Sequence, residues 1–189
     1  MKKLSLFACA SLLAALPSVA FSASSVSVEP FRSVELRGGG HVVLRRGTIQ
    51  RVTILEGSTQ FTHFHVKPDE QLVIDACDSN CPRHYDLEME IVTPRIDGVA
   101  IEGGGKIESD RSFGRQEAIG VAIQGGGHID IRTIDAGHVD AAVDGGGHIA
   151  LRAERSLEAA VNGGGNISYW GNPSVTSAVS GGGSINKGG

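Results

Sequence analysis

The segment Val143-Asp-Gly-Gly-Gly-His-Ile149 decides the fold, because its pattern returns along the whole chain. A glycine triplet stands at its centre, with a polar residue on each side and an aliphatic residue at each end. Five other segments follow the same pattern, at 36–42, 101–107, 123–129, 161–167 and 179–185. The six triplets hold most of the 27 glycines, so the glycine is patterned and does not indicate disorder.

The residues around the triplets predict strands with one buried and one solvated face. Alternation with a period of two places the aliphatic residues on one face of each strand and the polar residues on the other. The aliphatic positions are Leu36, Ile101, Ile123, Val143, Val161 and Val179 before the triplets, and Val42, Ile107, Ile129, Ile149, Ile167 and Ile185 after them. A further column expected to be buried lies six residues before a triplet, at Ile119, Val139, Leu157 and Val175.

The spacing of the triplets predicts an all-β solenoid. From Gly103 onward, successive triplets begin 22, 20, 18 and 18 residues apart, which suits one coil whose strands stack in parallel on the coil before. Residues 103–189 are therefore expected to form regular coils. The glycines either turn a corner with positive φ or let neighbouring backbones approach closely, and a corner or bulge is the favoured interpretation.

The preceding part of the chain, residues 29–102, is strand-rich but less regular. Lys67-Pro-Asp-Glu70 is typical of a hairpin turn, and Pro94 is expected to end a strand. The strands are expected around 34–36, 41–44, 52–55, 61–66, 71–75, 85–92 and 98–101.

Residues 1–22 have the pattern of an export signal. Lys2 and Lys3 precede the apolar run 4–15, and Ala20-Phe-Ser22 offers small residues where a signal peptidase cleaves. Lipidation at Cys9 is the weaker alternative, because too few apolar residues precede it. The remaining residues, 23–189, are expected to form a single domain without a membrane-spanning segment.

The charge of the chain argues against nucleic acid as a partner. The net charge is -4 and no basic run occurs, whereas proteins that bind nucleic acid concentrate Lys and Arg on one surface.

Taken together, several segments resemble a known bacterial family. Phe31-Arg-Ser-Val-Glu-Leu-Arg-Gly-Gly-Gly40, the strand 71–74, Ile91-Val-Thr-Pro94 and the serial glycine triplets are similar to the family described as putative auto-transporter adhesin, head GIN domain. The resemblance implies a right-handed parallel β-helix in an exported cell-envelope protein of a bacterium, with adhesion as the proposed role. It supplies no catalytic residue.

Cys77 and Cys81 have two interpretations. In an exported protein, two cysteines this close most simply form a disulfide across a tight loop. The alternative is a zinc site built from His63, His65, Cys77 and Cys81, since the two histidines alternate on one strand and so share a face.

The candidate binding residues are polar residues near the triplets. His128 and His148 should lie about 5 Å apart on an outer face. The other candidates are Asp130, Asp144, Asn162, Asn166 and Trp170. The polar residues could form a binding or catalytic strip, although a solvated stack is the simpler interpretation. Trp170 should point outward, where its indole could stack on a sugar or shield the edge of a coil.

The sequence as a whole favours a non-enzymatic binding or adhesion module in the periplasm or on the cell surface. Its ligand would be a glycan or another envelope protein, and no cofactor is expected. A polysaccharide-active enzyme and a purely structural envelope protein are the alternatives. A homo-oligomer formed through the last coil, which has no capping segment, is a further hypothesis.

Overall fold

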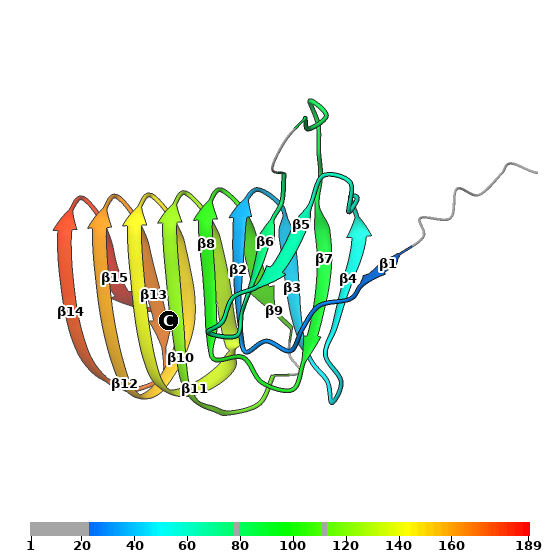
Figure 1. Ribbon diagram of the computed structural model, residues 1–189. Helices are drawn as coiled ribbons and strands as arrows, with labels where there is room; N and C mark the ends of the chain where they lie inside the picture. The colour runs from blue at the N-terminus through cyan, green and yellow to red at the C-terminus, as the bar shows by residue number, and fades with distance from the viewer. Residues whose placement is uncertain (1–22, 78–79, 111–112) are drawn as a thin grey trace, which may run out of the picture.

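The computed structural model describes residues 23–77, 80–110 and 113–189, and these form an all-β structure. The predicted signal sequence, with Cys9, lies outside the described residues. Fifteen strands of the described part join in one strongly curled mixed sheet with the shape of a half-barrel (Figure 1). Within this part, no helix is long and apolar enough to cross a membrane.

Two parallel ladders make up most of the sheet. The front ladder contains β2 (Ser33–Gly38), β8 (Gly98–Gly103), β10 (Gln116–Gly125), β14 (Ser174–Gly181) and the second halves of β11 (His128–Gly145) and β12 (His148–Gly163). The back ladder contains β3 (His41–Arg46), β9 (Lys106–Ser109), β13 (Asn166–Trp170), β15 (Ser184–Lys187) and the first halves of β11 and β12. Because β11 and β12 run through both ladders, the sheet is continuous around its curl.

Equivalent residues of successive repeats pair with one another, as the sequence predicted. Ile129 is in register with Ile149, and Ile149 with Ile167, in the back ladder. These side chains are at most 1% exposed and belong to one hydrophobic core. The last repeat departs from the prediction, because Val175 is 40% and Val179 48% exposed on β14, which pairs within the described residues only with β12.

The glycine triplets combine both of the proposed roles. Gly145 has φ +123°, and a Cβ there would lie 2.5 Å from the carbonyl oxygen of Gly125 in the neighbouring repeat. A Cβ on Gly147 would lie 2.5 Å from Cγ2 of Ile123. The middle glycine, Gly146, has open space around that position. The first glycine therefore turns the corner and allows close stacking, the third allows close stacking, and the middle one is not sterically required.

The N-terminal part adds antiparallel strands to the sheet. β4 (Arg51–Glu56) pairs with β7 (Glu88–Thr93) and with β1 (Ser24–Val26), while β7 runs parallel to β3. β5 (His63–Val66) and β6 (Gln71–Asp75) form a hairpin whose turn includes the hydrogen bond from Glu70 N to Lys67 O (3.0 Å). The predicted turn and the end of β7 before Pro94 are confirmed.

The predicted disulfide joins Cys77 and Cys81, whose Cα atoms are 6.2 Å apart. With both sulfurs bonded to each other, neither is free to act as a thiolate ligand of the alternative zinc site. His63 and His65 are exposed on one face of β5, and the described residues hold no metal-binding group of three or more His, Cys, Asp or Glu.

Candidate functional site

The candidate residues chosen from the sequence lie on two different faces. Asp144 and Asn162 precede their triplets and lie on the front ladder, where they are neighbours in register. His128, His148 and Asn166 follow their triplets and lie on the back ladder. Because the chain turns at each triplet, the polar residues on its two sides lie on different ladders and do not form one site.

On the back ladder, the histidines stack as predicted. The ring centroids of His128 and His148 are 6.4 Å apart, and both side chains are exposed. They belong to a row that also contains His41, Lys106, Asn166 and Ser184.

The carboxylates beside this row are held by cations. Hydrogen bonding from Lys106 lowers the pKa of Glu108 most strongly, and His41, with Nε2 2.9 Å from Oε1, adds to the effect against the opposing influence of burial. Burial would raise the pKa of Asp130, but hydrogen bonds from Arg132, the shortest 2.6 Å, lower it below its ordinary value. Both carboxylates therefore remain ionised, whereas a general acid requires a raised pKa.

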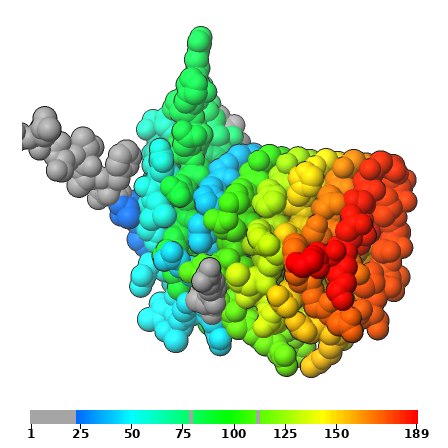
Figure 2. All heavy atoms as spheres, turned by 180° about the vertical axis from the view of Figure 1, so that it is seen from behind, coloured from blue at the N-terminus to red at the C-terminus, as the bar shows by residue number. Residues whose placement is uncertain are grey.

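Trp170 is partly covered by neighbouring groups. Cζ of Arg132 lies 4.9 Å from the ring centroid, and the indole Nε1 donates a hydrogen bond to the carbonyl oxygen of Gly189 (3.1 Å). The C-terminal segment, red in Figure 2, lies across the back of the molecule. These contacts fit the interpretation of Trp170 as a shield better than that of an open platform for a sugar.

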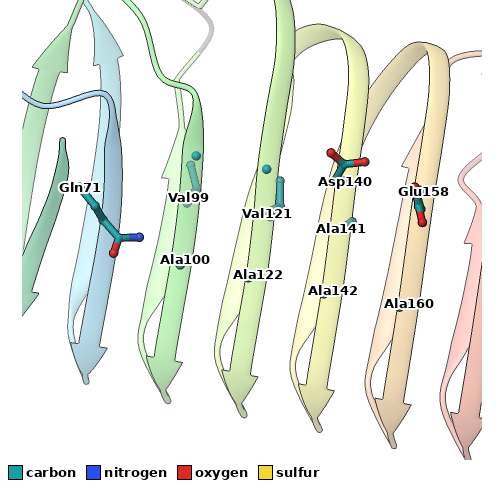
Figure 3. Close-up of a pocket in the computed structure, with 12 residues that line it drawn as sticks. Gln71, Val99, Ala100, Val121, Ala122, Asp140, Ala141, Ala142, Glu158 and Ala160 are labelled. Carbon is teal, nitrogen blue, oxygen red and sulfur yellow. The ribbon is translucent and has the colours of Figure 1, made fainter. Parts of the chain in front are cut away.

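The front ladder carries a groove that sequence reasoning did not identify. Its floor is a row of outward-facing alanines in register on four neighbouring strands: Ala100, Ala122, Ala142 and Ala160. Figure 3 shows these alanines side by side across the strands. Two adjoining hollows, of about 620 and 390 Å³, share all four alanines. We call this surface the alanine groove.

The two rims of the alanine groove differ in composition. One rim begins with Gly98 and Gly120 and continues with Asp140 and Glu158. The other rim is polar throughout and consists of Glu102, Gln124, Asp144 and Asn162. Two of the candidates from the sequence, Asp144 and Asn162, therefore belong to this groove, where Asn162 donates a hydrogen bond to Asp144 (3.2 Å).

A charged cluster closes one end of the alanine groove. Glu35 occupies the place of the alanine in β2 and accepts hydrogen bonds from Arg37 (2.7 Å) and Lys67 (2.9 Å). Burial would raise the pKa of Glu35, but these hydrogen bonds and charges outweigh it and lower the pKa. Arg37 also lies 3.3 Å from Glu102, so the cations at this end are engaged by carboxylates.

The sequence does contain a signal for this groove. Alanine stands immediately before the aliphatic residue that precedes the triplet in five of the six repeats, at Ala100, Ala122, Ala142, Ala160 and Ala178. Alanine is a poor strand former, so its return at an outward strand position is informative.

One part of the chain, which includes Ala122, Ala142 and Ala160 of the groove, is similar to a known protein family. Residues 111–173 match the family described as putative auto-transporter adhesin, head GIN domain. The chain matches no curated protein sequence.

Several crystal structures are similar to this chain at low identity. A putative adhesin from Bacteroides fragilis is 20% identical, with 90% of this chain and 98% of that chain covered and a TM-score of 0.48. A putative lipid binding protein from Parabacteroides distasonis is 14% identical, with 89% and 96% covered and a TM-score of 0.41. A putative cell adhesion protein from Clostridium sporogenes is 12% identical, with 88% and 98% covered and a TM-score of 0.39. The resemblance to the head GIN domain family that the glycine repeats indicated is confirmed, and residues 111–173 carry it.

Proposed function

We propose that this protein is an exported, non-enzymatic binding module that holds a linear glycan in the alanine groove. The observation that carries the proposal is the register of the front ladder, which repeats one alanine between two polar rims on successive strands. Neighbouring strands lie about 4.8 Å apart, so the groove repeats at a short, constant step. A chain of similar units lying across the strands would meet the same surface at each step.

Side chains alone must recognise a ligand in this groove. The backbone N–H and C=O groups of the central strands are used in the parallel ladder, so a peptide cannot bind here by adding a strand. The rims offer carboxylate and amide oxygens, which accept hydrogen bonds from hydroxyl groups. The methyl groups of the alanines offer a smooth apolar floor for the C–H face of a sugar ring.

We also propose a more specific fold for the protein and its export to the bacterial envelope. The in-register repeats support a right-handed parallel β-helix. Such a rigid helix would present equivalent side chains to the ligand at a constant spacing. Export to the bacterial envelope is supported by the signal pattern of residues 1–22, by the Cys77–Cys81 disulfide and by the family match to adhesins.

The charges favour binding over catalysis. Three carboxyl groups of the described residues have shifted pKa values, and all three, in Glu35, Glu108 and Asp130, are lowered. A glycosidase instead needs one carboxylic acid with a raised pKa opposite a second carboxylate.

A glycan array with two matched variants tests the proposal. Ala142→Phe fills the floor of the groove, while Ala150→Phe makes the same change at a half-buried outward position of the back ladder. We expect the unmodified protein and Ala150→Phe to bind the same linear glycans, and Ala142→Phe to lose them. Binding retained by Ala142→Phe, or turnover of a bound glycan, would refute the proposal.

A further inference from the structure

We infer that the glycan held in the alanine groove carries amino groups, so that the ligand is a cationic linear polysaccharide. This inference rests on the function proposed above and narrows its ligand to one chemical class. It follows from the charges, the hydrogen-bonding capacity and the shape of the groove.

The lining of the groove carries negative charge only. Of the described residues that line the two hollows, five are carboxylates and none is Lys, Arg or His. Glu35 and Glu102 have cationic neighbours in Arg37 and Lys67. Asp140, Asp144 and Glu158 form no salt bridge within the described residues. An acidic polysaccharide would therefore be repelled, and a cationic one attracted.

Two of these carboxylates lie in an arrangement that opposes folding. Asp140 and Glu158 are direct partners in the register of β11 and β12, and both are exposed. Like charges directly opposite each other on neighbouring strands destabilise a sheet. A cation bound between Asp140 and Glu158 would remove this repulsion. Ligand binding therefore accounts for the pair, whereas packing does not.

The rims also define which hydrogen-bonding groups a ligand must bring. Ionised carboxylates only accept hydrogen bonds, so the ligand has to supply donors. An ammonium group offers three donors together with a positive charge, and charge-assisted hydrogen bonds are stronger than neutral ones. Asp140 and Asp144 are four residues apart on one strand, about 13 Å, so acceptors stand on both sides of Ala142.

Gly120 and three alanines of the groove are not required by packing. A Cβ on Gly120 would have no atom nearer than the carbonyl oxygen of Asp97 at 4.0 Å, and φ of Gly120 is not positive. The side chains of Ala122, Ala142 and Ala160 are exposed, so larger residues would fit there without a clash in the core. Residues that break a local folding preference without a structural reason are typical of functional surfaces. In the groove, these small residues keep the floor below the level of the charged rims.

A binding assay with four defined oligomers tests the inference. The purified protein is titrated at about pH 5.5, where amines are protonated, with glucosamine hexasaccharide, N-acetylglucosamine hexasaccharide, galacturonic acid hexasaccharide and hexalysine. We expect glucosamine hexasaccharide to bind at least about tenfold more tightly than its neutral N-acetyl form, with the difference shrinking in about 1 M salt. The double variant Asp140→Asn, Glu158→Gln should lose this preference, whereas Glu29→Gln, which removes an exposed charge elsewhere, should keep it.

The outcomes separate the inference from the function on which it rests. Equal binding of the charged and neutral hexasaccharides, both lost in Ala142→Phe, would overturn the inference and leave glycan binding intact. Tighter binding of hexalysine than of any sugar would also overturn it and assign the groove to a basic peptide. Binding of none of the three glycans would overturn the inference and count against the proposed function too.

Discussion

The stability of single-residue variants in one glycine triplet offers a direct test of the stacking geometry. In Gly145→Ala, the new Cβ would lie 2.5 Å from the carbonyl oxygen of Gly125, which accepts the hydrogen bond from Gly146 N (2.9 Å). Relieving this clash must lengthen that hydrogen bond. The backbone conformation at φ +123° is also unfavourable for any residue with a side chain.

The expected loss of stability follows from these two effects. A strained backbone conformation costs about 1–3 kcal/mol, and a weakened backbone hydrogen bond costs about 1–2 kcal/mol more. We therefore expect Gly145→Ala to lower the free energy of unfolding by about 2–5 kcal/mol and the melting temperature by at least about 5 °C. Gly146→Ala is the matched control, because open space surrounds its Cβ position, and it should be neutral or stabilise by up to about 1 kcal/mol.

The two variants can be compared by urea and thermal unfolding, followed by circular dichroism and tryptophan fluorescence. Two probes are needed because repeat proteins can unfold in stages, in which case one melting temperature would not report on the whole sheet. Equal destabilisation by both variants, or full stability of Gly145→Ala, would refute the assignment of different roles to the first and middle glycines.

Three further predictions follow from the ion pairs, the disulfide and the separation of the two faces. Because the folded pKa of Glu35 lies below its ordinary value of 4.5, the stability it contributes is complete above about pH 4.5 and is lost as the pH falls through the lowered folded value. Glu35→Gln should therefore be less stable at neutral pH and lose less stability on acidification, as urea unfolding across a pH series would reveal. Cys77→Ser with Cys81→Ser opens a loop of only five residues, so we expect a loss of about 2 kcal/mol or less, and a much larger loss in the same unfolding assay would contradict a purely local role. Trp170 lies at the back ladder, so its fluorescence should stay unchanged when a glycan saturates the alanine groove, whereas quenching would place the ligand on the back of the molecule.

The core of the sheet was predictable from the sequence because it repeats. Ile129, Ile149 and Ile167 stand at the same place in each copy, and period-two alternation assigns them to the buried face. The exposure of Val179 was not predictable by the same rule, since burial also requires a neighbouring strand on each side. The antiparallel pairing of β4 with β7 was not predictable either, because strand patterns identify strands and do not identify their partners.

The candidate site was predicted only in part, for a geometrical reason. His148 and Asp144 are four residues apart in the sequence, yet the triplet between them turns the chain and sends them to different ladders. The alanine groove was not predicted, because the candidate residues were polar and Ala142 and Ala160 are apolar. Their significance appears only when the register shows that they form one continuous floor.

The repeats differ in length, and the sheet takes up the difference away from the groove. Irregular pairing between Asp130 and His138 lies in the bend that joins the two ladders, so a copy of 20 residues and the next copy of 18 still deliver their alanine to the same row. Duplicating one copy within a gene would therefore extend the floor by a single strand spacing and leave the rest unchanged. The number of sugar units bound at once can therefore increase one copy at a time during evolution, while the residues that contact the ligand stay the same.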